Sequence, residues 1–355
     1  MDKVKVVKKF EAAQNALVLQ SSDLSLETIA QMVDSKAIDV DPTYQRRDRW
    51  KPTAQSALIE SFLLNVPVPP VYLAEDDFGT YSVIDGKQRI TTIHKFLRDK
   101  FALTGLAKFA EVDGAKFVDL PKQLKNALSI RPYLRVVTLL KQTDPELKYE
   151  VFTRLNTGGE PLLPQEIRNA LYRGELNDLL FQLGENSFLR AQLKIKTIND
   201  TRYKEMQDVE AVLRFLCLSA EWKAFSGNMR KSLDTYAAQH QNPTTANLAA
   251  SQSRFEVAIK RCKALWGSNA FKRYDGTSFR DQFLSALYDA EMIAVNELTE
   301  RRFLTLRDKR AEIEAATLGL FKDEKFVDSV RVSTNTPSKV VYRVDKVKQL
   351  LAQIG

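Results

Sequence analysis

The fold of the first half of this 355-residue chain is decided by the stretch Tyr81-Ser82-Val83-Ile84-Asp85-Gly86-Lys87-Gln88-Arg89-Ile90-Thr91-Thr92. The residues up to Ile84 have the pattern of a short strand, whereas beyond Gly86 the apolar residues recur at the spacing of a helix. A strand that enters a helix through an Asp-Gly turn places the positive end of the helix dipole at that turn. Because Gly86 has no Cβ, a phosphate could approach the backbone closely there.

Charged and polar side chains next to this turn have the chemistry of a phosphate site. Lys87 and Arg89 supply positive charge, and a guanidinium can hold phosphate through two parallel hydrogen bonds. Asp85 could hold a hydrated Mg²⁺ or orient a water molecule. Three further hydrogen-bonding side chains follow on the expected helix, namely Gln88, Thr91 and Thr92.

A simpler alternative is that Asp85-Gly86 forms a type I′ hairpin turn, which would leave Gln88 and Arg89 in solvent on a second strand. The residues after the turn match the period of a helix, with Ile90 and Ile93 on one face. This period favours a turn that opens a helix over the hairpin turn, and the local residues by themselves leave the phosphate site and an ordinary Asp-Gly turn both open.

A second candidate cluster lies earlier, where Tyr44-Gln45-Arg46-Arg47-Asp48-Arg49-Trp50 places three arginines beside two aromatic residues. A base could stack on Tyr44 or Trp50, and a phosphate could bind Arg46. The alternative is a charged loop whose Trp50 packs into the core.

A third cluster reads Phe152-Thr153-Arg154-Leu155-Asn156-Thr157-Gly158-Gly159-Glu160 and continues into Pro164-Gln165-Glu166-Ile167-Arg168-Asn169. It predicts a helix that ends at Asn156, a Gly-Gly turn, and a second helix with Pro164 in its first turn. The alternative is an ordinary connection between two helices. The density of arginine and asparagine around the turn makes Arg154 and Asn156 candidates for completing a site.

Proline usage separates short elements from long helices, because ten of the twelve prolines precede residue 175. The first part predicts helices at 25–34, 53–65 and 144–155, a hairpin with strands at 71–73 and 81–84, and a strand at 134–140. The second part has four apolar stripes at helical spacing. The stripes are Leu176, Leu179, Leu180, Leu183; Val209, Val212, Leu213, Leu216; Phe255, Ile259, Cys262, Trp266; and Phe279, Phe283, Leu284, Leu287.

These elements predict an α+β fold with three parts. A domain with a small mixed sheet, residues 1–175, precedes a helical bundle, residues 176–320. Residues 321–355 would form a short C-terminal β-hairpin, from runs at 326–332 and 340–344, and a last helix packed on the bundle.

The composition excludes several classes of site. Two histidines, His94 and His240, and two cysteines, Cys217 and Cys262, are too few and too scattered for a four-ligand zinc site, an HNH nuclease or a catalytic triad. We find neither a signal peptide nor an apolar run long enough to cross a membrane, and therefore expect a cytoplasmic protein without a membrane partner. The 53 basic and 45 acidic residues give a net charge of +8, a mild preference for anionic partners.

Together, the three clusters resemble the GmrS-type domain, the ParB/Srx-like N-terminal domain of GmrSD-type modification-dependent restriction enzymes and of many stand-alone bacterial defence proteins. The resemblance covers about residues 20–175 and rests on motifs that agree in order as well as content. They are Tyr44-Gln45-Arg46 with Trp50, Val66-Pro67-Val68-Pro69-Pro70, Ile84 to Thr92, Arg154-Leu155-Asn156 and Glu166-Ile167-Arg168.

This resemblance implies a domain that binds, and usually hydrolyses, a nucleoside triphosphate, GTP or ATP, with Mg²⁺. The family's Asp-Gly-Gln-Gln-Arg signature is matched at Asp85, Gly86, Gln88 and Arg89, and Lys87 stands where Gln is usual. Lys87 could tighten phosphate binding, and it leaves the rate of hydrolysis open. The implied catalytic residues are Asp85, Gln88 and Arg89, with Mg²⁺ on Asp85. The implied nucleotide-binding residues are Tyr44, Gln45, Arg46, Trp50, Gly86, Lys87, Thr91, Thr92, Arg154 and Asn156.

In this family an HNH-type nuclease domain commonly follows, which the scarcity of histidine excludes here. We therefore expect a component of an anti-phage or modification-dependent restriction system whose nuclease is encoded on another chain. An alternative is a regulatory or nucleic-acid-binding module without hydrolysis, with DNA phosphates bound by the basic segment 339–348. A third is that the Asp85 and Arg89 site itself cuts nucleic acid. The chain could also form an oligomer.

Overall fold

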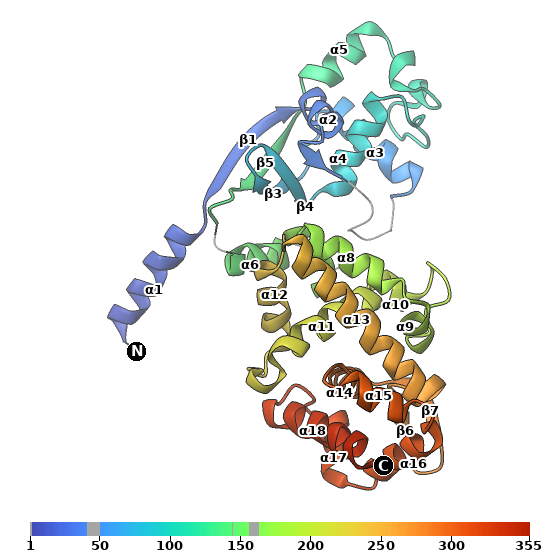
Figure 1. The fold of residues 1–355 in the computed structure, drawn as a ribbon. Coiled ribbons are helices and arrows are strands. Elements are labelled where there is room, and N and C mark those ends of the chain that lie inside the picture. The colour runs from blue at the N-terminus through green and yellow to red at the C-terminus, as the bar shows by residue number, and fades with distance from the viewer. Residues whose placement is uncertain (1, 41–49, 144, 156–162) are drawn as a thin grey trace. The chain divides into compact units, whose positions relative to one another are not determined.

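The computed structural model describes residues 2–40, 50–143, 145–155 and 163–355, and the chain divides into two compact units, residues 1–171 and 172–355 (Figure 1). The fold class is α+β, as predicted: a small mixed sheet comes first and a helical bundle follows. Each unit is described by itself below.

The sheet of the first unit has five strands in the order β1-β5-β3-β4-β2. The strands are β1 (Leu19–Ser25), β2 (Ile38–Asp39), β3 (Val71–Asp77), β4 (Thr80–Asp85) and β5 (Tyr133–Leu139). The predicted hairpin is the antiparallel pair β3–β4, and β1 is antiparallel to β5. Strands β3 and β5 are parallel, as are β2 and β4, which makes the sheet mixed.

Alternation along the strands gives the sheet two apolar faces. Val71, Leu73 and Val83 belong to the core that also contains the helices of one face. These are α2 (Leu26–Asp34), α3 (Pro52–Leu63), α4 (Lys87–Leu97) and α5 (Lys122–Ile130). Ala74 and Ile84, one residue further along each strand, pack with the other core. Its helices are α6 (Pro145–Leu155) and α7 (Pro164–Leu171).

The second unit is a bundle with a small two-stranded sheet. Its helices are α8 (Glu175–Gly184), α9 (Ser187–Gln192), α10 (Thr201–Lys204), α11 (Gln207–Glu221), α12 (Met229–Gln239), α13 (Thr245–Trp266), α14 (Ser285–Asn296), α15 (Glu300–Leu306), α16 (Arg310–Leu320), α17 (Glu324–Arg331) and α18 (Pro337–Gln353). Helix α14 forms the centre, since every residue from Ala286 to Val295 is buried, and it packs against α11, α13 and α18.

The C-terminal hairpin predicted at 326–344 is wrong, because those residues form α17 and α18. Valines suggested strands, but Phe326 and Val330 are four residues apart and both are buried, as on one face of a helix. The side chain of Asp323 also caps α17 by accepting hydrogen bonds from the Lys325 and Phe326 N–H groups.

The two-stranded sheet lies earlier and consists of β6 (Lys272–Tyr274) and β7 (Phe279–Phe283). Strand β7 contains Phe279 and Phe283, the first two residues of the fourth apolar stripe, for which the sequence predicted a helix. The turn explains the difference, because the Asp275 carboxylate accepts hydrogen bonds from the Thr277 and Ser278 N–H groups and closes the hairpin.

The basic segment 339–348 is paired within the second unit. Lys339 lies 2.6 Å from Asp328, Lys346 lies 3.4 Å from Asp323, and Lys348 lies 2.5 Å from Glu297. Arg343 is fully buried. The segment therefore presents much less unpaired charge to DNA than its composition suggested.

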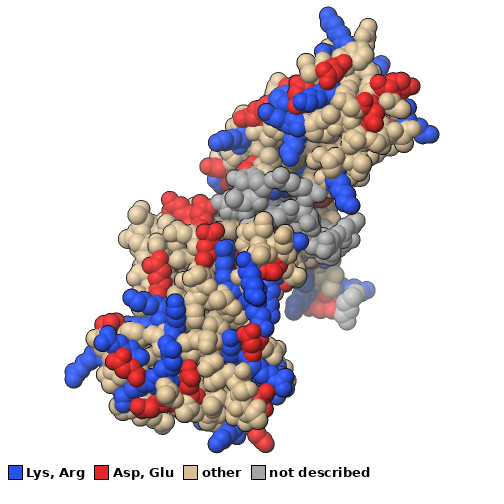
Figure 2. All heavy atoms as spheres, turned by 90° about the vertical axis from the view of Figure 1, so that its right-hand side faces the viewer, with Lys and Arg blue, Asp and Glu red and all other residues tan. Residues whose placement is uncertain are grey.

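Among the described residues, none of the helices combines the length and the apolar character needed to cross a lipid bilayer. Figure 2 shows basic and acidic side chains interspersed on one face of the molecule. The excess of positive charge is thus not gathered into a single patch on that face.

Because the carboxyl group of Glu291 on α14 is buried, we expect the free energy of unfolding of the second unit to depend on pH. Glu291 is 1% exposed, the Phe271 N–H donates to its Oε2 at 2.9 Å, and burial raises the pKa well above its usual value. The folded state therefore keeps a proton that the unfolded state loses near pH 4.3. Stability is lost as the pH rises from there toward the folded pKa, by up to about 1.4 kcal/mol per pH unit.

We expect Glu291→Gln, which cannot ionise, to flatten this dependence and to stabilise the protein more at pH 8 than at pH 5. Urea denaturation at several pH values measures the effect. Glu256→Gln, an exposed position on α13, is the matched control and should leave the dependence unchanged. Parallel curves for Glu291→Gln and the unmodified protein would contradict the prediction.

Candidate functional site

The turn between β4 and α4 has the predicted strand–glycine–helix form. Gly86 is the N-cap of α4 with φ +94° and ψ 14°, in the left-handed region that favours glycine. A Cβ on Gly86 would lie 2.3 Å from Cγ1 of Val71 at the start of β3. Because α4 follows directly, the type I′ hairpin alternative is wrong, and only glycine fits between the two strands at this point.

Hydrogen bonds of Arg89 connect this turn to Pro69 and Pro70, the residues that precede β3. Its Nη1 donates to the carbonyl oxygens of Pro69 and Pro70 at 2.6 and 2.9 Å, and its Nη2 donates to Oδ2 of Asp85 at 2.5 Å. The Arg89 side chain is 13% exposed and that of Asp85 is 36% exposed. Of the five N–H groups of a guanidinium, three are thus used to hold β3, β4 and α4 together.

Gln88 connects the turn to the start of α3. The Trp50 N–H donates to Oε1 of Gln88 at 3.3 Å, across 38 residues of sequence. Trp50 is 37% exposed, so it is not packed in the core as the alternative interpretation required. Tyr44, Gln45 and Arg46, the rest of this predicted cluster, lie outside the described residues.

Thr91 and Thr92 place hydroxyl groups in the interior of the first unit. Thr92 is fully buried, and Oγ1 of each threonine is buried without a hydrogen-bond partner in the described part of the chain. A buried hydroxyl normally has a partner, because leaving one unsatisfied costs about 1–3 kcal/mol. The pair is therefore unusual for a helix that otherwise packs in a normal apolar core.

Helix α7 contains a row of buried polar residues that the prediction of site residues omitted. Gln165, Glu166, Arg168 and Asn169 are each at most 3% exposed. Gln165 Nε2 donates to Oδ1 of Asn169 at 2.8 Å, and Arg168 Nη1 donates to Oε1 of Gln165 at 3.2 Å. The helix packs against β4, the strand that ends at Asp85. The available signal was four polar residues within an eight-residue helix.

Arg154 has a different environment from the turn. Its side chain is 77% exposed, and its Nε lies 2.7 Å from Oε1 of Glu150 on the same helix. Such an exposed pair contributes little to stability. Asn156, the other candidate from the third cluster, lies outside the described residues.

Asp85 is the candidate for a Mg²⁺ ligand. Mg²⁺ is commonly held by one or two carboxylates together with phosphate oxygens and water. Oδ2 of Asp85 already accepts a hydrogen bond from Arg89, so an ion would use Oδ1. The described residues contain no group of three His, Cys, Asp or Glu side chains that could hold a metal by themselves. The residues thus fit an ion that arrives with a phosphate, and do not form a closed protein site.

His94 and Arg98, at the far end of α4, have a structural role. His94 Nε2 lies 2.7 Å from Oδ1 of Asp34, and Arg98 Nε donates to Oδ2 of the same carboxylate at 2.8 Å. These two hydrogen bonds hold the pKa of Asp34 below its usual value. They tie α4 to α2 and so fix the direction in which the start of α4 points.

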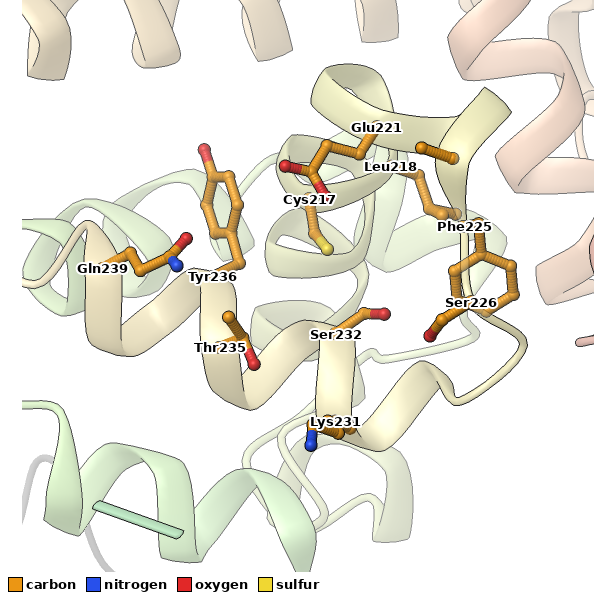
Figure 3. Close-up of a pocket in the computed structure, with 11 residues that line it drawn as sticks. Cys217, Leu218, Glu221, Phe225, Ser226, Lys231, Ser232, Thr235, Tyr236 and Gln239 are labelled. Carbon is orange, nitrogen blue, oxygen red and sulfur yellow. The ribbon is translucent and has the colours of Figure 1, made fainter. Parts of the chain in front are cut away.

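A pocket in the second unit contains none of the predicted site residues. It has a volume of about 160 Å³ and lies between α11 and α12. Figure 3 shows Cys217 of α11 on one side of it, and Ser232 and Thr235 of α12 on the other.

The first unit is thus an α+β domain in which a mixed five-stranded sheet ends its central hairpin in a glycine-started helix. Residues 29–173 match the family described as "GmrSD restriction endonuclease, N-terminal domain". This part of the chain is a GmrSD-type N-terminal domain, as its motifs predicted. In the same comparisons, no curated protein and no solved structure matches the chain.

Proposed function

We propose that the chain is a nucleoside-triphosphate-binding component of a restriction system, with GTP or ATP bound at the start of α4. The name of the matching family supports the restriction system. The main observation in favour of nucleotide binding is the turn at Gly86. Val71 leaves no room for a side chain at this position, and the helix that begins there has Lys87 and Arg89 in its first turn.

The parts of this turn support phosphate binding in different ways. The first N–H groups of an α-helix lack intrahelical acceptors, and the dipole makes that end positive. Lys87 would add a charge-assisted contact. Arg89 would act mainly by holding the turn in place, because most of its donors serve Asp85, Pro69 and Pro70.

Other groups of the domain would complete the site. The unsatisfied hydroxyls of Thr91 and Thr92 are donors that a ligand or its water could meet. Trp50, held at Gln88 and partly exposed, offers a face on which a base could stack. Tyr44, Gln45, Arg46 and Asn156 keep their proposed roles from the sequence. When bound, Mg²⁺ would neutralise phosphate charge beside Asp85.

Binding without turnover is the second candidate function, and the Asp85–Arg89 pair favours it. The Asp85 carboxylate and the Arg89 guanidinium are paired with each other, so two side chains that hydrolysis would need are already occupied. A domain of this kind would use nucleotide to regulate a nuclease on another chain. DNA remains a proposed ligand of that assembly.

We expect Lys87→Ala to weaken binding of GTP or ATP with Mg²⁺ by about ten- to a hundredfold, the usual contribution of a charge-assisted hydrogen bond. Titration calorimetry with each nucleotide measures this. Lys100→Ala, an exposed lysine just beyond α4, is the matched control and should bind as the unmodified protein does. Equal affinities for all three proteins would argue against the site.

Phosphate release by the same samples, measured with and without DNA, distinguishes nucleotide hydrolysis from binding without turnover. Release that Arg89→Lys abolishes, with binding retained, supports hydrolysis. Binding without release from the unmodified protein supports the regulatory module.

A further inference from the structure

Helix α1 (Lys3–Ala16) has an exposed apolar face. The face consists of Val4, Val6, Val7 and Phe10, which are 66%, 51%, 53% and 62% exposed. At 3.6 residues per turn these four side chains fall within an arc of about 160°, and Lys5, Lys8 and Lys9 lie on the opposite side. An apolar stripe along an amphipathic helix is normally buried against another element.

We propose that this face pairs two copies of the chain, with their α1 helices antiparallel and centred on Val7. In that register Val4 lies at the level of Phe10 of the partner subunit, and Lys3 lies at the level of Glu11 of the partner subunit. The same contacts recur on the other side of the twofold axis, as a symmetric interface requires. Lys3 and Glu11 lie on the same side of the helix as these four residues, one before Val4 and one after Phe10, so the charges at the two ends of the face are complementary.

The distribution of charge favours a second copy in this direction. A parallel pair would set Lys3 against Lys3 of the partner subunit, and like charges repel. In the antiparallel pair, Lys5, Lys8 and Lys9 point away from the contact and remain in water. The helix also benefits, because an isolated helix of 14 residues is marginal in water without packing.

The size of the contact sets its strength. Helix α1 is about 21 Å long and leads into β1 at the edge of the sheet (Figure 1). Two faces of this length bury less than the roughly 1,200–2,000 Å² of a stable interface. The dimer is therefore weak and forms as the protein concentration rises. It is independent of nucleotide.

Sedimentation velocity of the full chain over a wide range of concentrations tests the pairing. The mass should rise from that of the 40.4 kDa monomer toward twice that value. Val7→Glu, at the centre of the contact, should keep the protein monomeric throughout. Lys5→Glu, on the opposite side of the same helix, is the matched control and should dimerise as before. A monomer at every concentration, or a dimer that Val7→Glu leaves intact, would overturn the proposal.

A charge exchange tests the antiparallel register. Lys3→Glu and Glu11→Lys alone each replace two attractive pairs by two repulsive ones and should weaken dimerisation by about tenfold. The double variant restores opposite charges across the axis and should dimerise nearly as the unmodified protein does. A double variant weaker than either single one would overturn the register. Thermal unfolding checks that all variants keep the fold of both units.

Discussion

Gly86→Ala is expected to lower the free energy of unfolding of the first unit by about 2–5 kcal/mol, combining left-handed strain and overpacking. At φ +94° a side chain is strained, and its Cβ would lie 2.3 Å from Cγ1 of Val71 and 2.9 Å from its Cβ. The strand β3 would have to move away from the turn. Under the proposed function, nucleotide binding is lost as well, because the start of α4 is displaced.

Gly79→Ala is the matched control for this prediction. Gly79 has a similar φ of +79°, and a Cβ there would meet nothing within 4 Å. It should therefore show the strain alone, about 1–2 kcal/mol, and leave nucleotide binding intact. Urea denaturation followed by circular dichroism compares the two. If both variants lost the same stability, the contact with Val71 would not be the cause.

Asp289→Asn is expected to destabilise the second unit by about 3–5 kcal/mol, because it leaves buried arginines without their counter-ion. Arg214 donates to both carboxylate oxygens of Asp289 at 2.6 Å, and Arg343 donates to Oδ2 at 3.0 Å. Both Asp289 and Arg343 have fully buried side chains. Burial lowers the pKa of Arg343, against the opposing effect of Asp289. The three residues join α11, α14 and α18 at the centre of the bundle.

Asp23→Asn provides the comparison, since it removes an ion pair of similar geometry on the surface. Asp23 accepts two hydrogen bonds from Arg135, at 2.9 and 3.0 Å, and both side chains are about half exposed. Solvent screens such a pair, so the loss should stay below about 1 kcal/mol. Unfolding in urea is followed by the fluorescence of Trp222 and Trp266 for Asp289→Asn in the second unit, and by that of Trp50 for Asp23→Asn in the first unit. A loss at Asp289 no larger than at Asp23 would contradict the role of burial.

Local patterns were sufficient for most elements of the first unit. The hairpin of β3 and β4, the helix after Gly86, and the helices α6 and α7 were all predicted, because their periods and caps lie within short segments. The C-terminal segment failed for a physical reason. Valines are compatible with either a strand or a buried helix face, and only packing against α14 decides between them.

The candidate site was predicted in part. The sequence identified the turn around Gly86 and the residues beside it, since their chemistry is local. It placed Arg89 against phosphate, whereas the structure engages it with Asp85, Pro69 and Pro70. It placed the polar row of α7 within the third cluster but named none of these residues for the site, because their burial depends on tertiary packing. The segments 41–49 and 156–162, which hold Tyr44, Gln45, Arg46 and Asn156, lie outside the described residues.

The sequence by itself determined the α+β class, the strand–glycine–helix turn and the match of its motifs to the GmrSD-type domain. These follow from residue order, because hydrophobic period, turn chemistry and motif spacing act over a few residues. The tertiary structure alone decided which partner each charged side chain has. An arginine can be solvated, clamp a loop or lie buried beside a carboxylate, and the choice depends on groups far away in sequence, as Arg89 and Arg343 show.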